Sequence, residues 1–401
     1  MEPVWKRNLY ILWVGLFFNH LAYTLSVPFF PIFLEHDLGV KAGVEAWAGV
    51  SISLSFLISG LCAPFWGSIA DRYGKKPMLI RSGIGLGLAH LANYLVHDPY
   101  SFILVRVFQG LMAGFSPLSV AFVGSNTPDK HVGSALGIIS TATAAGSILG
   151  PLAGGLCSHW FGLRECFIVS GLITLMSAVI IIFGVKEVHE RQTGPRERMW
   201  RDLKQAVAKP GILPMYALLF IVSTSVTVLE PLLALYVVQL GGSADSATLS
   251  SGIVFSAVGV ATVIMGPYWG KIGGKIGYEK TLFIGLIGGA LGNLLQLVFH
   301  DLVGFGVLRF SYGLFFAAVF PAMNALIVQY ADAEYRSKAI SLSQSFSQFG
   351  IVAGPLLGGM LGGWLGIHSL FMLTGVTLFA AGWYIRLRHA KRSEPAFERP
   401  L

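Results

Sequence analysis

The stretch Gly67-Ser-Ile-Ala-Asp-Arg-Tyr-Gly-Lys-Lys76 is a dense cluster of charge between two long apolar runs. With Arg81 shortly after it, the cluster holds four basic groups and one acid. Charged side chains are costly inside a bilayer, so this stretch must lie at a water interface. Its excess of positive charge predicts a turn on the cytoplasmic side, with a membrane helix before it and another after it.

A weaker copy of this stretch lies 203 residues further along the chain. Pro64-Phe65-Trp66-Gly67 matches Pro267-Tyr268-Trp269-Gly270, and a basic residue and a glycine follow in both copies. In the second copy Gly274 replaces the acid. The sequence therefore predicts two related halves.

The composition is that of a polytopic membrane protein, with 54% hydrophobic residues, 12% charged residues and a mean hydropathy of +0.68. About 20 apolar residues are needed to cross the hydrocarbon core. Twelve stretches meet this requirement, near 9–34, 47–70, 78–97, 100–125, 132–160, 164–186, 212–240, 246–274, 280–299, 302–330, 337–365 and 367–386.

The placement of basic residues predicts the orientation in the membrane. If both termini are cytoplasmic, only Lys41 and Arg164 face outside and only Arg106 and Arg309 lie within the membrane. The rest of the 28 Lys and Arg residues then lie inside, as the positive-inside rule requires. The net charge of +8 is thus explained without a nucleic-acid partner.

The predicted domains follow from this arrangement. Residues 1–186 and 212–388 each form a six-helix bundle, 187–211 form a cytoplasmic linker with an amphipathic helix, and 389–401 form a cytoplasmic tail. The three cysteines, Cys62, Cys157 and Cys166, have neither metal-ligand spacing nor the even count of a disulfide framework. They are interpreted as small apolar filler, and no metal site is predicted.

Three motifs resemble signatures of the major facilitator superfamily. The charged turn resembles the loop between helices two and three, and Arg106-x-x-Gln109-Gly110 resembles the helix-four signature. The antiporter signature of helix five is similar to Gly146-x-x-x-Gly150-Pro151-x-x-Gly154-Gly155, which helix eleven repeats at Gly350, Gly354-Pro355 and Gly358-Gly359. Glycines at this spacing also serve close helix packing alone.

The resemblance implies the twelve-helix drug:proton antiporters, which are bacterial multidrug efflux pumps with two pseudo-symmetric bundles around a central cavity. Helices one, four, seven and ten would line that cavity. The resemblance also implies a conformational switch made of Gly67, Asp71, Arg72, Gly74, Lys75 and Lys76. Asp71 is expected to stabilise the outward-open state by facing the positive end of helix eleven near Ser337.

Polar residues within the predicted helices mark the candidate site. Arg106 and Arg309 would each cost at least ~2.5 kcal/mol if they faced lipid, so each must face a polar interior or a partner. The resemblance implies proton transfer for Arg106, and the alternative is a structural anchor to backbone carbonyls. Two roles are open for His20: a proton relay, or a neutral histidine that is hydrogen-bonded in a packed interface.

Glu230 is the one acid found deep in the predicted membrane region, on a stripe with Ser223 and Thr227. A buried carboxyl whose surroundings change can take up and release a proton, so Glu230 is the predicted principal proton-coupling residue, with Arg309 tuning it. The run 229–236 looks like helix seven of bacterial multidrug pumps, including the staphylococcal quinolone pump, although the second acid of that pump, in helix ten, is absent here. The alternative is a permanent ion pair between Glu230 and Arg309.

The predicted substrate cavity is lined by polar and aromatic residues of helices one, four, seven and ten. They are Asn19, Tyr23, Ser26, Phe30, Gln109, Thr227, Tyr236, Tyr312 and Phe316. The aromatic members of this set, like other aromatic residues in membrane helices, individually serve packing more often than ligand contact.

The predicted function is proton-coupled efflux of small, mostly lipophilic compounds by alternating access, driven by the proton gradient without a cofactor. The expected partners are the substrate, protons and the lipid bilayer, around a monomer in the inner membrane of a bacterium. One alternative is dedicated export of a metabolite such as a siderophore or a sugar. A membrane-embedded enzyme is disfavoured because His-Glu-x-x-His, Gly-x-Ser-x-Gly and paired intramembrane carboxylates are absent from the sequence. A channel fits a two-fold repeat with a single buried acid less well than a carrier does.

Overall fold

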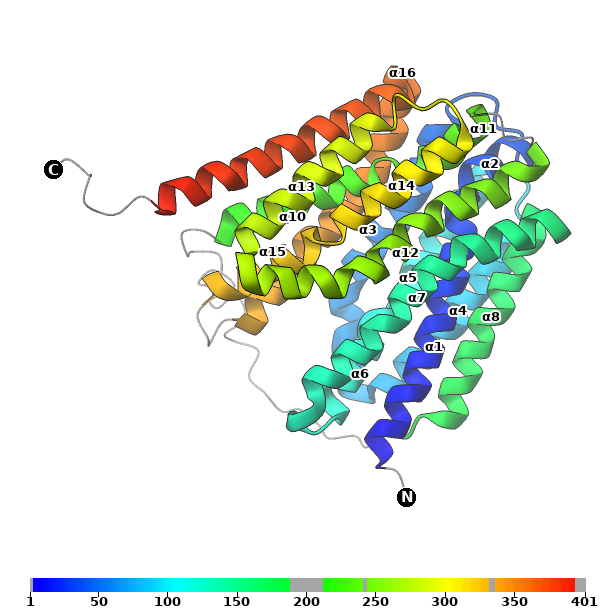
Figure 1. Ribbon diagram of the computed structural model, residues 1–401. Coiled ribbons are helices and arrows are strands. Elements are labelled where there is room, and N and C mark those ends of the chain that lie inside the picture. The colour runs from blue at the N-terminus through cyan, green and yellow to red at the C-terminus, as the bar shows by residue number, and fades with distance from the viewer. Residues whose placement is uncertain (1–2, 188–211, 241–243, 332–335, 394–401) are drawn as a thin grey trace. The chain divides into compact units, whose positions relative to one another are not determined.

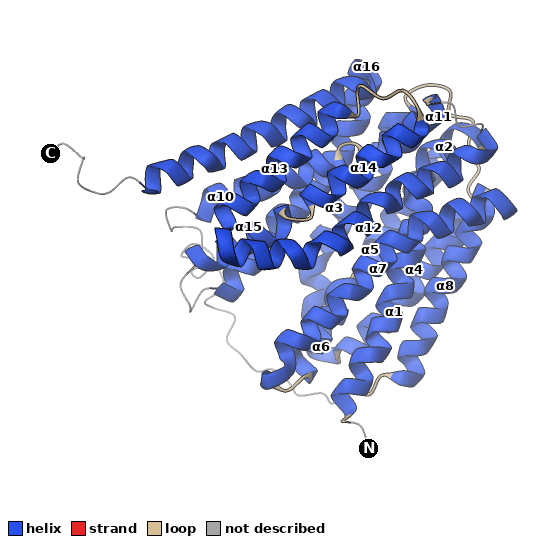
Figure 2. Cartoon of the chain, viewed as in Figure 1, coloured by secondary structure: helices blue, strands red, loops and turns tan. Residues whose placement is uncertain are grey.

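The computed structural model describes residues 3–187, 212–240, 244–331 and 336–393, and these ranges form helices and connecting turns with no strand (Figure 1). Figure 2 shows that loops occupy only short stretches between the described helices. All of the stretches predicted to cross the membrane are helical, which confirms the all-α membrane fold.

The first half of the chain contains α1 (Val4–Ser26), η1 (Val27–Phe29), α2 (Phe30–His36), α3 (Val44–Tyr73), α4 (Lys75–Tyr94), α5 (Pro99–Met112), α6 (Phe115–Asn126), α7 (Asp129–Phe161) and α8 (Leu163–Gly184). The second half contains α10 (Ile212–Thr227), α11 (Glu230–Gln239), α12 (Ala244–Ile276), α13 (Tyr278–Leu295), α14 (Leu302–Phe316), α15 (Val319–Tyr330) and α16 (Arg336–Ser393).

Within the described residues, 9 segments are long and apolar enough to span a membrane. One of them, Leu342–Arg388, covers the eleventh and twelfth predicted helices, because only Gly366, at φ 75°, interrupts the helical geometry of α16. α4 and α13 stand at the positions of the third and ninth predicted helices. The twelve predicted helices are therefore consistent with the structure.

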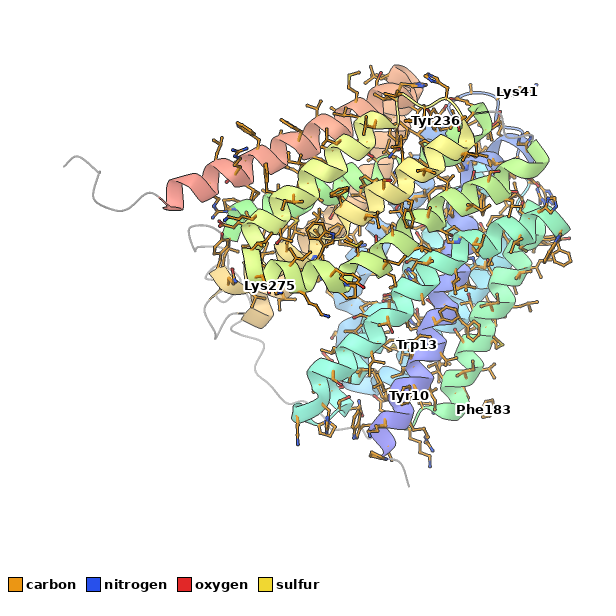
Figure 3. All side chains as sticks on the ribbon, in the orientation of Figure 1. Tyr10, Trp13, Lys41, Phe183, Tyr236 and Lys275 are labelled. Carbon is orange, nitrogen blue, oxygen red and sulfur yellow. The ribbon has the colours of Figure 1, made fainter. Side chains whose placement is uncertain are left out.

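Large apolar side chains point outward over much of the surface. Trp364 is 85% exposed and Phe183 is 83% exposed, and Figure 3 shows Phe183 and Tyr10 projecting from α8 and α1. Such a surface suits hydrocarbon as the solvent, where exposed apolar side chains carry no penalty.

The chain forms two compact units that do not coincide with its two sequence halves. Unit 1 comprises Met1–Gly194, Glu230–Ser256 and Pro355–Gly363, and unit 2 comprises Pro195–Leu229, Ala257–Gly354 and Trp364–Leu401. The bundles at 1–186 and 212–388 and the tail at 389–401 remain predictions. Of the predicted linker, only Glu187 lies within the described residues.

In unit 1, α1 packs against α7 and α8, and α4 packs along α8 (Figure 1). One core cluster joins α1, α6, α7 and α8 through Leu12, Phe122, Ile139 and Ile181. A second cluster, rich in aromatic rings, joins α2, α5 and α8 through Phe33, Phe102 and Phe167. These two clusters hold α1 and α5, which carry several of the candidate residues, including Tyr23 and Arg106.

In unit 2, one cluster joins α10, α13, α15 and α16 through buried residues that include Tyr216, Leu286, Met323 and Leu378. The Tyr216 hydroxyl donates a hydrogen bond of 3.1 Å to the carbonyl of Ala339. This places the start of α16 against α10.

Helices one, four, seven and ten, which the resemblance assigns to the cavity, are all discontinuous. Helix one changes to a 3-10 turn at Val27–Phe29, and helix four stops at Met112 and restarts at Phe115 through Gly114, at φ 125°. Helix seven breaks between Thr227 and Glu230, and helix ten breaks between Phe316 and Val319. Each break frees backbone carbonyls that need partners inside the protein.

Two symmetry-related tryptophans supply such partners at helices four and ten. In unit 1, Trp66 Nε1 donates to the carbonyl of Leu111 at 2.9 Å. In unit 2, Trp269 Nε1 donates to the carbonyl of Leu314 at 2.7 Å. Both pairs repeat at the 203-residue offset of the sequence, which explains why the Trp-Gly motif recurs in a turn copy that has lost its acid.

Helix four receives further support from α4. The Arg81 guanidinium lies 3.6 Å from the ring centroid of Trp66 and donates to the carbonyl of Ala113 at 2.8 Å. The Ser82 hydroxyl donates to the carbonyl of Met112 at 2.9 Å. The break in helix four is thus held open and satisfied by side chains from neighbouring helices.

We expect the Trp269→Phe variant to lose about 1 kcal/mol of stability, because the ring remains but the partly buried carbonyl of Leu314 loses its donor. Thermal unfolding of the purified protein would measure this loss. Trp364→Phe, on the exposed surface of α16, is the control and should unfold like the parent. Equal stability of all three proteins would contradict the assigned role of Trp269.

Candidate functional site

The charged turn joins α3 to α4 through Gly74, which has φ 101° and ends α3. A side chain at this position would be strained, and its Cβ would lie 2.8 Å from the carboxylate of Glu187. Asp71 and Arg72 are exposed, and the Cβ position of Gly67 is open. The predicted pairing of Asp71 with helix eleven joins the two units and stays a prediction.

Glu187 lies shortly after α8, which ends at Gly184, and it holds the first turn of α4. Its carboxylate accepts hydrogen bonds from the backbone N–H groups of Lys75, at 2.7 Å, and Lys76, at 2.9 Å. Lys76 Nζ in turn donates to the carbonyls of Ile182, at 2.8 Å, and Val185, at 2.7 Å. An acid thus caps the positive end of α4, and a cation caps the negative end of α8.

The start of α1 is fixed at the same end of unit 1. Asn8 Nδ2 donates to the Lys186 carbonyl at 2.7 Å, and the Lys186 N–H donates to Asn8 Oδ1 at 3.0 Å. The basic turn, the beginning of α1 and the end of α8 therefore meet at one end, where Lys6, Arg7, Lys75, Lys76 and Lys186 gather.

We expect Glu187→Gln to destabilise the protein by ~1 kcal/mol and to slow transport, because the cap of α4 loses its charge and part of its bonding. Thermal unfolding and uptake into proteoliposomes would measure the two effects. Glu35→Gln, an exposed acid at the end of α2, serves as the control. If the Glu187 variant matched this control in both assays, the role of Glu187 as the cap of α4 would be refuted.

The glycine motif of α7 packs against α1 along one stripe. Added Cβ atoms at Gly146, Gly150 and Gly154 would all collide with α1. At the same contact, Thr24 Oγ1 donates to the Gly146 carbonyl at 2.9 Å. The first three glycines of the motif therefore allow close approach of two helix backbones.

The other residues of the motif pack against the first part of α12, also within unit 1. A Cβ on Gly155 would lie 2.8 Å from the Thr248 carbonyl, and Gly252 lies against the carbonyl of Pro151. Ser256 Oγ donates to the carbonyl of Ile148 at 2.6 Å. The motif thus has two packing faces, one for α1 and one for α12.

The repeat of the motif in α16 behaves in the same way. In unit 2, Gly350 and Gly354 lie against α10, and Thr227 Oγ1 donates to the Gly350 carbonyl at 3.4 Å. In unit 1, Gly359 and Pro355 lie against the Glu45 carbonyl and Gly49 of α3. The close-packing interpretation of both motifs is confirmed by these contacts, whereas their link to export stays a prediction.

We expect Gly155→Ala to cost ~1 to 3 kcal/mol of stability and to impair transport, because the new methyl group meets backbone rather than a movable side chain. Gly137→Ala, on the same helix with open space at its Cβ, is the matched control and should be neutral or slightly stabilising. Transport by the Gly155 variant at the parental rate would exclude a functional role for this contact.

Arg106 is a buried cation on α5, with 1% of its surface exposed. Its guanidinium lies 4.7 Å from the ring centroid of Phe30 and 5.0 Å from that of Phe102. Its side chain has no hydrogen bond to a carbonyl within the described chain, although its own carbonyl accepts one from Ser55. The aromatic rings, rather than the carbonyl anchor considered above, hold this side chain.

Tyr23 of α1 is influenced by charged candidate residues of two other elements, α5 and α11. The charges of both Glu230 and Arg106 act on its hydroxyl, so the three side chains form one electrostatic group within unit 1. Glu230 is the first residue of α11, directly after the break in helix seven. The positive end of α11 therefore stabilises its carboxylate form.

The remaining candidates divide between the units. Unit 1 also contains Asn19 and Ser26 on α1, Gln109 on α5 and Tyr236 on α11, which Figure 3 labels. Ser26, Gln109 and Tyr236 are buried, and Asn19 is half-buried. Unit 2 contains Thr227, Arg309, Tyr312 and Phe316. The cavity that these residues would share, and the alternative ion pair of Glu230 with Arg309, stay predictions.

Arg309 repeats the aromatic surroundings of Arg106. Its guanidinium lies 5.8 to 5.9 Å from the ring centroids of Phe305, Tyr312 and Phe371. Tyr312 also stacks on Phe316, with ring centroids 5.0 Å apart. These two predicted cavity residues therefore have a packing role in unit 2.

His20 faces α7. Its Nε2 atom lies 2.8 Å from Ser147 Oγ, at a hydrogen-bond distance. This geometry favours the packed-interface interpretation of His20 over the proton relay.

The opposite end of unit 1 is held by two acids. Asp37 pairs with Arg164 at 3.5 Å, and its partial burial raises its pKa above the ordinary value despite this cation. Asp98 accepts hydrogen bonds from the hydroxyl and N–H of Ser101 at the start of α5, which lowers its pKa. Asp301 caps α14 in unit 2 at the 203-residue offset.

Two contributions were missed by sequence reasoning. Glu187 was assigned to the linker, although an acid just after a membrane helix, on the side of a basic turn, is a recognisable signal. Phe102 stands one turn before Arg106, and Phe305 stands one turn before Arg309. This repeated Phe-x-x-x-Arg spacing would have indicated the aromatic contacts.

Comparisons with known proteins agree with this architecture. The family model described as Major Facilitator Superfamily matches residues 12–261 and 215–400. The chain is 33% identical over 381 residues to "Multidrug resistance protein MdtG" of Escherichia coli O17:K52:H18, covering 94% of this chain and 93% of the relative.

Solved structures show the same fold. The crystal structure of a bacterial homolog to the human lysosomal transporter Spinster, inward-facing and occupied, has a TM-score of 0.80 at 15% identity, covering 97% of this chain and 98% of that chain. The crystal structure of a mutant of the nucleoside transporter NupG has a TM-score of 0.77 at 12% identity, covering 95% of this chain and 99% of that chain.

The family match and the multidrug resistance relative, together with the long apolar helices, show that the chain is a multi-pass membrane transporter rather than an enzyme. More specifically, this chain belongs to the Major Facilitator Superfamily. Its bacterial relatives indicate the inner membrane of a bacterium as its location.

Proposed function

We propose that this protein is a proton-coupled efflux antiporter that exports small, mostly lipophilic compounds by alternating access. The observation that carries the proposal is the group formed by Glu230, Tyr23 and Arg106, in which the charges of an acid at a helix break and of a buried cation both act on one tyrosine hydroxyl. The relative named as a multidrug resistance protein supports drug-like substrates. No cofactor other than the proton gradient is needed.

Glu230 is the proposed coupling residue. The start of α11 stabilises its charged form, whereas burial favours its neutral form. A rocking motion that changes water access to this position would alter the balance between the two forms. A proton taken up from outside would then be released inside, in exchange for substrate.

The proposed orientation has both termini in the cytoplasm. Its support is the end of unit 1 at which α1 begins and Glu187 holds the charged turn, because the basic residues gathered there belong on the cytoplasmic side. The transporter is proposed to act as a monomer.

We expect purified parent protein to release protons when a transported compound is added, and the Glu230→Gln variant to release none, because the amide cannot titrate. The measurement uses a pH-sensitive dye in weakly buffered detergent solution. Binding of an uncharged ligand should persist in the variant, which shows that it is folded. Glu35→Gln is the control and should release protons as the parent does.

Proton release by Glu230→Gln at the parental level would place coupling elsewhere.

The substrate is identified by efflux from cells across a panel of lipophilic cations, quinolones and anionic compounds. Efflux of several unrelated compounds supports multidrug export, whereas efflux of one metabolite, such as a siderophore or a sugar, would establish the dedicated exporter instead.

A further inference from the structure

Arg106 has hydrogen-bond donors that the protein does not use. Its side chain is 1% exposed, and its Nε and Nη2 atoms are buried without a hydrogen-bond partner in the described part of the chain. A buried cation whose N–H groups lack acceptors is costly to keep in a folded protein. A side chain of this kind indicates a ligand that supplies the acceptors.

The aromatic neighbours of Arg106 leave that requirement unmet. The rings of Phe30 and Phe102 lie 4.7 and 5.0 Å from the guanidinium carbon, within the range of cation–π attraction. Aromatic rings stabilise the charge but offer no acceptors to its N–H groups. The aromatic rings therefore stabilise the positive charge of Arg106 in part, but they provide no hydrogen-bond acceptors for its N–H groups.

No acid of the described chain lies within ion-pair distance, 4.0 Å, of Arg106. Glu230 and Arg106 both act on Tyr23, yet the acid and the cation form no direct pair. Two further buried polar atoms, Ser26 Oγ and Gln109 Oε1, also have no partner among the described residues. Gln109 lies one helical turn from Arg106, on the same face of α5.

We propose that Arg106 binds the carboxylate of an amphiphilic acid, so that the preferred substrates are compounds with one acidic group and an apolar body. The guanidinium fork matches the two oxygens of a carboxylate, and such paired, charge-assisted bonds are among the strong hydrogen bonds of proteins. The aromatic residues around Arg106, including Phe30 and Tyr23, suit an apolar body. The inference rests on the proposed export function and names its substrate class.

Arg309 is not assigned the same role. Three rings surround it, and of its side-chain nitrogens only Nε is buried without a partner in the described structure. The two arginines are equivalent in sequence, but Arg106 has two such nitrogens, Nε and Nη2, whereas Arg309 has one.

The test uses three probes that share one aromatic body: naphthylacetate, naphthylethanol and naphthylethylamine. Their affinities for the purified full-length protein are measured by calorimetry at neutral pH without a gradient. We expect the parent to bind the acid at least about tenfold more tightly than the alcohol or the amine, as one charge-assisted hydrogen bond would provide. Binding of the amine as tightly as the acid would overturn the proposal without any variant.

Two variants locate the preference. Arg106→Gln should bind the acid no better than the alcohol, and Arg106→Lys should keep the charge but lose about tenfold in affinity for the acid, because an ammonium lacks the fork. Unchanged affinity for naphthylethanol shows that a variant is folded. Parental affinity of either variant for the acid would refute the assignment to Arg106.

The outcome is separable from that of the proposed function. Acid binding is measured without proton coupling, so parental proton release by Glu230→Gln would remove the coupling residue and leave the acid preference intact. Conversely, proton-coupled export of naphthylethylamine with no binding preference for the acid would support the antiporter and overturn this inference.

Discussion

Lipid offers no hydrogen bonds, so every backbone group in the membrane must be satisfied within the protein, and this constraint shapes the four broken helices. A helix that stops and restarts in the membrane releases carbonyls, and these need donors from neighbouring helices. Trp66 and Trp269 meet this need in their respective units, and Arg81 assists at helix four. These donors allow helices four and ten to depart from regular geometry within the membrane.

Most of the fold could be predicted because membrane helices leave a strong one-dimensional signal. Apolar stretches located the membrane helices of the described residues, and the 203-residue repeat related the two halves. The breaks were not predicted, because the hydropathy of an apolar run is the same whether its helix is continuous or broken. Glycine spacing predicted close packing, but it could not show that α7 uses one stripe for α1 and other residues for α12.

The candidate site was predicted less completely, since its chemistry depends on contacts between distant segments. Arg106 and Glu230 were evident as charges in apolar surroundings. The tyrosine on which both act, and the rings around Arg106, became evident only once α1, α5 and α11 were placed together. Glu187 shows the same limit, because its carboxylate reaches N–H groups more than 100 residues earlier in the chain.

The bonds at the basic end of unit 1 also bear on how the protein is made. Asn8 and Lys186 exchange two hydrogen bonds across 178 residues, and Glu187 then caps α4. A chain that emerges from the ribosome in order cannot complete these bonds until residue 187 has been synthesised. Until then the start of α4 and the start of α1 lack these hydrogen-bond partners. The first five predicted membrane helices are therefore inserted before the bonds at this end can form. The bonds of Asn8, Lys186 and Glu187 can therefore form only after all six predicted helices of the amino-terminal half have been synthesised.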